Sequence, residues 1–372
     1  MRRILIDKKI KDFAADYVKD LSLVVGDVEA CLRNLAEELK KRTTKIYVCT
    51  PDNVNCYKGD EYQSVSQYVG KIVGHYGEIN DLLPSKYDGV MSDIDERLGT
   101  IKVDEVLVKL REKEKQPLYE MIVDIMGYNK VRKEVLPQYV NKLEIKTCVY
   151  CNAQFAITTL IEDVREKIML GKPGRPKKAI VIPRRGGYYE MDHNKPKSKY
   201  PYLCTNFYNL QPCCSSCNKR KSAQDLSFSV YYEEGDPDSA PLRFAISEQD
   251  VIDFHTKGKC KGVKPYLCDK ANPTKRVVAR KDGTLAEQFN YIFDIDKIYA
   301  EHDDEVEELL WRNRIYTKGI VSATNSQFKD LQIEDFDFRR YILGTYPNRE
   351  DALKRPLTAM KQDIWEQVIK DE

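Results

Sequence analysis

Two Cys-x-x-Cys turns constrain the fold of this chain more than any other feature of its sequence. The first turn contains Cys148 and Cys151, and the second contains Cys214 and Cys217. Deprotonated cysteines bind zinc tetrahedrally, and each such turn supplies two ligands with little backbone strain. The turns lie farther apart than the about 15 to 20 residues of compact zinc modules. We therefore expect the four cysteines to hold a structural Zn²⁺ ion, with buried free thiols as the alternative.

The other cysteines bear on the choice of ligands and on the compartment. Cys213 adjoins Cys214, but only Cys214 has the two-residue gap to Cys217. The total of eleven cysteines is odd and the N-terminus lacks the apolar run of a secretory signal, which argues against a disulfide framework. No apolar stretch is long enough to cross a bilayer, so we expect a cytoplasmic protein without a membrane span. Six cysteines have no partner in a Cys-x-x-Cys turn and are expected to be free thiols: Cys31, Cys49, Cys56, Cys204, Cys260 and Cys268.

Length and patterning indicate an α+β chain of two or three packed regions, since it has 372 residues. Residues 1–145 show apolar side chains at helical spacing, as in VEACLRNLAEELKKR and VDEVLVKLREKEK. Residues 146–228 contain both cysteine turns and short strand patterns. Residues 229–372 are mixed and then helical, as in DEVEELLWRNRIY. We expect a zinc-clasped core embedded between two mostly helical regions.

Within the core, the pattern predicts a strand, a second strand and a helix. FAITTLI and YYEMDH have strand patterns, and NLQPCCSSCNKRKSAQ predicts a short helix that begins near Asn209. Between the two strands, residues 163–187 are polar, basic and broken by prolines and glycines. We expect a long hairpin or excursion there.

The segment between the cysteine turns carries residue types that phosphodiester hydrolysis requires. A neutral imidazole can take a proton from water, and His193 is the only one of the four histidines near the cysteines. The adjacent Asp192 offers a hard oxygen ligand for Mg²⁺ or Mn²⁺, which neutralises charge on a scissile phosphate. On an extended strand the two side chains face opposite sides, so either the backbone bends there or the metal sits at the strand end.

This arrangement resembles the HNH nuclease family, which has a ββα-metal fold. The matching residues, in order along the chain, are Asp192-His193, Asn209-Leu210, Cys214-Ser-Ser-Cys217-Asn218 and Lys221. The resemblance implies that His193 is the general base and that Asn209 holds its ring through a side-chain to backbone bond. It also implies that Asp192 and Asn218 bind a single catalytic Mg²⁺ or Mn²⁺ ion.

Two positions in this motif leave alternatives open. Asn218 stands where many members of the family have a histidine, so a neutral amide oxygen replaces an imidazole ligand. Asn206 is a rival to Asn209 for the positioning role, and we prefer Asn209 because it directly precedes Leu210.

A looser likeness extends beyond this segment. TCVYCN, DHNKPKSKYP and RPLTAMKQDI resemble the HNH subunit (PtuB) of Septu-type anti-phage defence systems. That resemblance implies a PtuA-type ATPase as a protein partner. Two other functions stay open: a stand-alone restriction-type endonuclease, and a non-catalytic zinc-binding module that binds nucleic acid or a partner.

Any surface for nucleic acid must be local, because the net charge is only +2. We expect two basic sets to bind the phosphates of nucleic acid, with DNA favoured over RNA. The set in the excursion comprises Lys172, Arg175, Lys177, Lys178, Arg184 and Arg185. The alternative to phosphate binding for this set is a solvated loop. The set around the Asp-His pair and on the following helix comprises Lys195, Lys197, Lys199, Lys219, Arg220 and Lys221.

Overall fold

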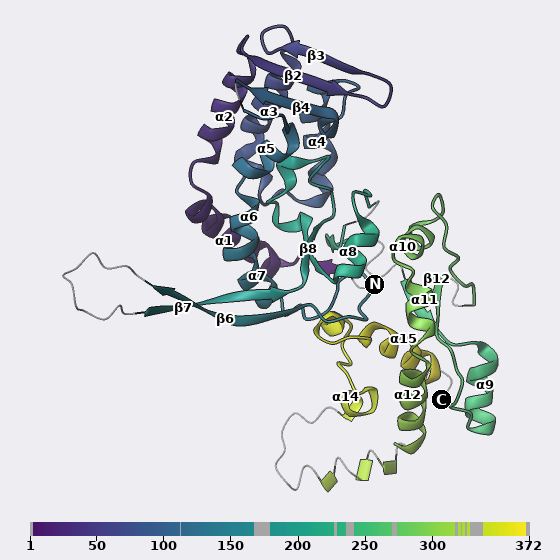
Figure 1. Ribbon diagram of the computed structural model, residues 1–372. Coiled ribbons are helices and arrows are strands. Elements are labelled where there is room, and N and C mark those ends of the chain that lie inside the picture. Colours follow the sequence, from purple (N-terminus) through teal and green to yellow (C-terminus); the bar gives the residue numbers. More distant parts are fainter. Residues whose placement is uncertain are drawn as a thin grey trace.

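The computed structural model describes residues 3–111, 113–166, 179–226, 229–235, 242–269, 274–316, 319–320, 322–323, 326–327 and 338–369. Helices and strands are mixed, as the α+β prediction requires. An N-terminal lobe and a C-terminal lobe lie at opposite ends of the molecule, and a two-stranded hairpin projects sideways between them (Figure 1). Among the described residues, no helix is both long and apolar enough to cross a membrane.

The N-terminal lobe is built mainly from amphipathic helices. The first helix begins after Asp7, whose side chain accepts a hydrogen bond from the backbone N–H of Ile10. Its buried residues recur every three or four positions, which is the spacing of one helix face: Ile10, Ala14, Tyr17 and Leu21. The helices of this lobe are α1 (Lys8–Val25), α2 (Val28–Leu39), α3 (Ser64–Ile79), α4 (Tyr87–Asp95), α5 (Leu118–Ile125), α6 (Tyr128–Glu134) and α7 (Leu136–Lys142).

The same lobe contains a four-stranded sheet that the helical prediction missed. A single 3-10 turn at Val103–Glu105 leads directly into a strand, so the helix expected over VDEVLVKLREKEK is wrong. Val106 and Val108 are buried and lie opposite Val48 and Ile46 of the neighbouring strand. Burial with a period of two overrides the helical spacing. The sheet has the order β3-β2-β4-β5, with β2 (Thr44–Cys49), β3 (Val54–Lys58), β4 (Val106–Leu110) and β5 (Gln116–Pro117).

The central region contains two paired strands followed by a helix. β8 (Glu190–His193) pairs antiparallel with β9 (Leu210–Cys213), and α8 (Ser215–Lys221) follows directly. The helix predicted to begin near Asn209 is therefore wrong at its start. Pro212 lies within this stretch, and proline is unfavourable inside a helix because it lacks the N–H donor. Two 3-10 turns, Pro201–Leu203 and Phe207–Asn209, fill the loop between the strands.

The excursion before β8 is a long β-hairpin. β6 (Ile157–Glu166) pairs antiparallel with β7 (Ala179–Tyr188) along its whole length, and the two strands extend away from the body (Figure 1). The long hairpin expected from the sequence is confirmed for these strands. The order predicted for the core is wrong in its first strand, because FAITTLI runs into β6 of this hairpin, whereas the strand paired with β8 is β9. Residues 167–178, between the strands, lie outside the described part of the chain.

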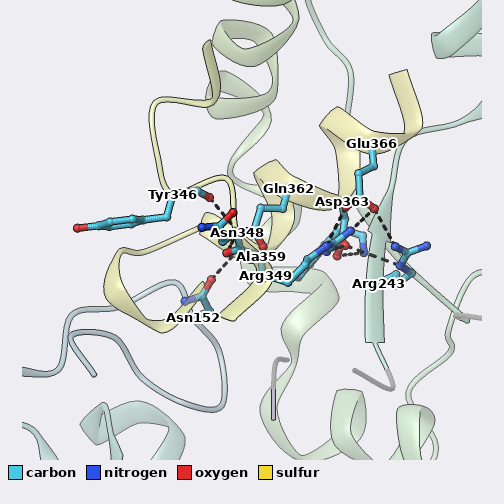
Figure 2. Close-up of polar contacts among 10 residues, drawn as sticks. Asn152, Arg243, Tyr346, Asn348, Arg349, Ala359, Gln362, Asp363 and Glu366 are labelled. Atoms are coloured by element: carbon cyan, nitrogen blue, oxygen red, sulfur yellow. Dashed lines mark hydrogen bonds and ion pairs between the residues drawn. The ribbon is translucent and has the colours of Figure 1, made fainter. Parts of the chain in front are cut away.

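The C-terminal lobe combines short strands with helices. Helix α15 (Thr358–Ile369) covers one edge of β11 (Leu242–Ala245), because Asp363 accepts from the Phe244 N–H at 3.1 Å and Gln367 exchanges two bonds with the backbone of Ile246. Arg243 and Arg349 form ion pairs with Asp363 and Glu366 beside this edge (Figure 2). Such cover satisfies backbone groups that an open strand edge leaves unpaired.

The elements of this lobe are β11 (Leu242–Ala245), α9 (Glu248–Lys257), β12 (Tyr266–Asp269), α10 (Leu285–Phe293), α11 (Ile295–Ala300), α12 (Asp303–Ile315), α14 (Phe338–Leu343) and α15 (Thr358–Ile369). Helix α12 confirms the prediction over DEVEELLWRNRIY. Strand β10 (Tyr231–Tyr232) pairs in parallel with β1 (Ile4–Leu5) at the start of the chain, and Tyr231 packs against Phe207 and Tyr208.

Candidate functional site

The cysteines of the two turns lie together in the structure. Their four sulfur atoms are within 4.8 Å of one another, and all four residues are buried. Thiolate sulfur is a preferred zinc ligand, and four of them complete a tetrahedral site. Within the described part of the chain, no other group of three or more His, Cys, Asp and Glu side chains converges in this way. The predicted ligands therefore fit a structural Zn²⁺ ion: Cys148, Cys151, Cys214 and Cys217.

The two turns reach the cluster by different local structures. Cys148 lies in a tight hairpin closed by the bridge between Thr147 and Phe155, and its N–H donates to the Gln154 carbonyl at 2.9 Å. Cys214 is the residue immediately before α8, and Cys217 lies in the first turn of that helix. One ligand pair thus depends on a hairpin and the other on the start of a helix.

The choice of Cys214 over Cys213 is confirmed. The Cys213 thiol donates to the Glu190 carbonyl at 3.6 Å and is not part of the sulfur cluster. Burial raises the pKa of Cys213 above its usual value, which keeps it as a neutral thiol.

A segment near the C-terminus holds the first cysteine turn in place (Figure 2). Asn152, which follows Cys151, is buried and has a φ of 51°, a left-handed conformation that asparagine tolerates better than most residues. Its Nδ2 donates to the Ala352 carbonyl at 2.9 Å, and its Oδ1 accepts from the Ala359 N–H at 3.1 Å. The Leu357 N–H donates to the Asn152 carbonyl at 2.7 Å. The motifs TCVYCN and RPLTAMKQDI, which are far apart in sequence, are therefore in direct contact.

Asp192 lies on the face of β8 that meets α8. Its Oδ2 accepts from the Tyr150 hydroxyl at 2.5 Å and lies 3.1 Å from the Lys221 ammonium. Burial raises the pKa of the Asp192 carboxyl, and the positive charge of Lys221 opposes that shift. Tyr150 belongs to the first cysteine turn, so the zinc site and Asp192 are directly connected.

His193 lies on the opposite face of β8, because alternate residues of a strand point to opposite sides. Only 5% of the residue is exposed, and its ring centre lies 4.7 Å from that of Tyr128 on α6. Its Nε2 is 3.0 Å from the Cys204 carbonyl oxygen. A carbonyl can only accept, so Nε2 carries the proton and Nδ1 keeps the lone pair. Burial lowers the pKa of His193 to about 3, which makes the imidazole neutral at pH 7.

Asn209 bonds the backbone of the loop that follows His193 rather than the imidazole ring itself. Its Nδ2 donates to the carbonyls of Leu203 at 2.9 Å and Lys195 at 3.1 Å. Its Oδ1 accepts from the Lys195 N–H at 2.7 Å. Leu203 precedes Cys204, the residue that accepts from His193. Asn209 thus ties together two parts of the loop between β8 and β9, one close to His193 and one next to Cys204.

Asn206, the rival for this role, faces the N-terminal lobe. Its Nδ2 donates to the Ile79 carbonyl at 2.6 Å and the Leu82 carbonyl at 3.0 Å, and its Oδ1 accepts from the Tyr87 hydroxyl at 2.6 Å. These bonds join the loop before β9 to α3 and α4 and give Asn206 a structural role.

Asn218 and Asp192 do not share a partner in this structure. The Asn218 side chain donates to the Glu190 carboxylate, whereas Asp192 is occupied by Tyr150 and Lys221. Two oxygen ligands of one divalent ion must both lie within about 2.0 to 2.6 Å of it. As these residues are arranged, they do not fit a shared catalytic cation, and we assign no step of a reaction to one.

The basic residues around the Asp-His pair differ in their surroundings. Lys197 is exposed, and its ammonium lies 5.0 Å from the centre of the Tyr128 ring, beside the imidazole. Lys221 is completely buried, so the prediction that it contacts nucleic acid does not hold in this conformation; its ammonium is bound to Asp192 instead. The other four basic residues of this set are exposed or half-buried: Lys195, Lys199, Lys219 and Arg220. Lys195 forms an ion pair with Asp225, and Arg220 forms one with Asp294.

The basic set of the excursion is described only at its base. Arg185 is exposed and donates to Asn141 of α7 at 3.1 Å. The side chain of Arg184 lies outside the described part of the structure, as do the residues Lys172, Arg175, Lys177 and Lys178.

Three residues that the sequence did not single out shape the site. Tyr128 packs on the imidazole, Tyr150 donates to Asp192, and Glu190 accepts from Asn218. Tyr150 alone had a sequence signal, since it lies between Cys148 and Cys151.

Comparison of the chain with models of known protein families, with curated proteins and with solved structures finds no match.

Proposed function

We propose that this protein is an HNH-type endonuclease that hydrolyses phosphodiester bonds of nucleic acid. The observation that carries the proposal is the order β8, β9, α8, with His193 at the end of the first strand and a cysteine turn on either side of the strand pair. A motif of this kind has weight only in its strand, strand and helix context. The succession of β8, β9 and α8 supports the proposal, and exposed Lys197 lies beside the imidazole to attract a phosphate.

His193 would move the proton in this reaction. Its Nδ1 lone pair accepts a proton from the attacking water, while the Nε2–H keeps donating to the Cys204 carbonyl and so fixes the ring. Because only 5% of His193 is exposed, substrate reaches Nδ1 only after the surrounding segments move. The structure is thus that of a closed site.

The zinc ion would contribute rigidity and no chemistry. Four cysteines fill all positions of a tetrahedral ion and leave none for water or substrate. Tyr150 extends that rigidity to Asp192 through its hydroxyl.

We further propose that the protein is the nuclease subunit of a Septu-type anti-phage complex with a PtuA-type ATPase. The contact between Asn152 and Ala359 supports this proposal, because it joins two of the outer motifs on which the resemblance depends. A partner that changes state with ATP also offers a way to open the buried imidazole.

A non-catalytic zinc-binding module is the second candidate. The observation that favours it is the closure of the site, in which His193, Asp192 and Asn218 all bond to other parts of the protein. Such a module uses its basic surface to bind nucleic acid or a partner without cutting.

Cleavage assays separate these candidates. The purified chain, alone and with any ATPase encoded beside it, is incubated with DNA and with RNA in Mg²⁺ or Mn²⁺. The nuclease proposal expects cleavage by the wild type and none by His193→Ala, with zinc content equal in both. Cleavage in the absence of an ATPase favours a stand-alone enzyme. Binding without cleavage under every condition supports the zinc module.

A further inference from the structure

A completely buried lysine lies beside Asp192. Lys221 is the last residue of α8, and none of its surface is exposed. Its Nζ lies 3.1 and 3.4 Å from the two carboxylate oxygens of Asp192, and it donates to the His193 carbonyl at 2.6 Å. An ammonium group has three protons, and these three acceptors account for them. The face of β8 that meets α8 therefore already binds one positive charge.

A buried amide without partners lies on the same face. Gln211 of β9 is opposite Asp192 in the strand register, so the two side chains point to the same side, with their Cβ atoms about 4.5 to 5.5 Å apart. Gln211 is 1% exposed, and within the described part of the chain neither its Nε2 nor its Oε1 has a hydrogen-bond partner. Burying an unsatisfied amide is costly, and in native proteins it often marks the place of an ion or a water molecule.

We propose that Asp192 and Gln211 form a cation site that Lys221 fills in this conformation and that opens to a divalent cation when the end of α8 moves away. Carboxylate and amide oxygens are the ligands that hard divalent cations prefer. Two cations at one carboxylate repel each other strongly in a buried setting, so Lys221 and the metal ion bind in alternation. The inference rests on the proposed nuclease function for the use of the cation, and it assigns Gln211 the ligand role expected of Asn218.

The backbone next to Lys221 is strained in the closed conformation. Ser222 has φ 49° and ψ −132°, a region that glycine adopts readily and other residues rarely do. Strain of this kind persists only where neighbouring contacts hold it, and it is frequent in segments that switch. The bonds of Lys221 to Asp192 and to the His193 carbonyl are the adjacent side-chain restraints, so their release lets the end of α8 relax.

Binding of Mn²⁺ to the zinc-loaded full chain, followed by the electron paramagnetic resonance signal of free Mn²⁺, tests the proposal. Lys221→Met removes the competing charge, and we expect Mn²⁺ to bind about tenfold more tightly or better. Lys219→Met is the matched control, because this exposed lysine on the same helix is removed without touching Asp192. Equal affinity in the two variants would overturn the proposal.

Double variants identify the ligands. Adding Asp192→Asn to Lys221→Met should abolish the gain in Mn²⁺ affinity, and adding Gln211→Leu should remove most of it. A gain that survives Gln211→Leu would exclude the amide as a ligand.

A variant that keeps the buried ion pair tests the proposal even if Lys221→Met fails to fold. Lys221→Met leaves a buried carboxylate unpaired, whereas Ser222→Gly retains the pair and relieves the strain. Stabilising the closed conformation should weaken Mn²⁺ binding severalfold relative to the wild type. Unchanged or tighter binding by Ser222→Gly would contradict the alternation of the two cations.

These outcomes are independent of cleavage. The expected Mn²⁺ affinities in a protein that cuts no nucleic acid would refute the nuclease function and leave the cation site standing. Cleavage that requires His193, without any gain in Mn²⁺ affinity in Lys221→Met, would refute the cation site and leave the nuclease function standing.

Discussion

Replacing Asn152 tests whether the C-terminal segment and the first cysteine turn form one folding unit. Its buried side chain makes three well-placed hydrogen bonds, to Thr147 at 3.0 Å, Ala352 at 2.9 Å and Ala359 at 3.1 Å. At about 1 kcal/mol for each bond, Asn152→Gly should lower the free energy of unfolding by about 3 kcal/mol. Asn152→Ala should lose about 1 kcal/mol more, because a φ of 51° suits glycine and strains alanine.

The assay is urea unfolding of the zinc-loaded protein, followed by circular dichroism and by a dye that reports released zinc. We expect the midpoint to fall from wild type to Asn152→Gly to Asn152→Ala, with zinc released in the same transition. Asn53→Ala, in an exposed turn between β2 and β3, is the control and should change stability by less than about 0.5 kcal/mol. A loss below about 1 kcal/mol in Asn152→Gly, or zinc release well before the helices unfold, would show that the C-terminal segment and the first cysteine turn are not one folding unit.

Three further predictions concern the central site. Tyr150→Phe removes a buried donor from Asp192 and should lower the free energy of unfolding by about 1.5 to 3 kcal/mol in the same assay; an unchanged value would show that the bond contributes nothing. Metal analysis should find zinc lost from Cys148→Ser and retained in Cys213→Ser, and full zinc in the first variant would exclude the four-cysteine site. Burial lowers the pKa of His193 to about 3. Below its ordinary pKa of about 6.5 the unfolded chain binds a proton that the folded protein does not, so stability should fall from pH 6.5 toward 3, less steeply in His193→Gln. Parallel profiles of the two proteins would contradict this.

Features that depend on local spacing could be predicted from the sequence. Helices α2 and α12 follow from apolar residues three or four positions apart, and the zinc ligands follow from two-residue gaps between cysteines. Strand β4 was missed because its partner β2 lies far earlier in the chain. Strand β9 was missed because all four of its residues are buried, so it shows no alternation of polar and apolar positions.

The candidate site shows the same division between local and long-range information. The opposite orientation of Asp192 and His193 follows from the geometry of a strand. The burial of Lys221 does not follow from sequence, because the run Lys219-Arg220-Lys221 is typical of a solvated helix end. Its environment depends on contacts with β8, and the unpaired amide of Gln211 likewise becomes evident only once β8 and β9 are paired.

We propose that His193 on β8 is the general base, and the rate of nucleic-acid cleavage by His193→Ala is the direct test of this role. His75→Ala, in the N-terminal lobe, serves as the matched control. General base catalysis contributes a factor of about 10² to 10⁴ to the rate, so we expect at least about a hundredfold loss in His193→Ala, with zinc content and helix content unchanged. Equal rates in the two variants would contradict it.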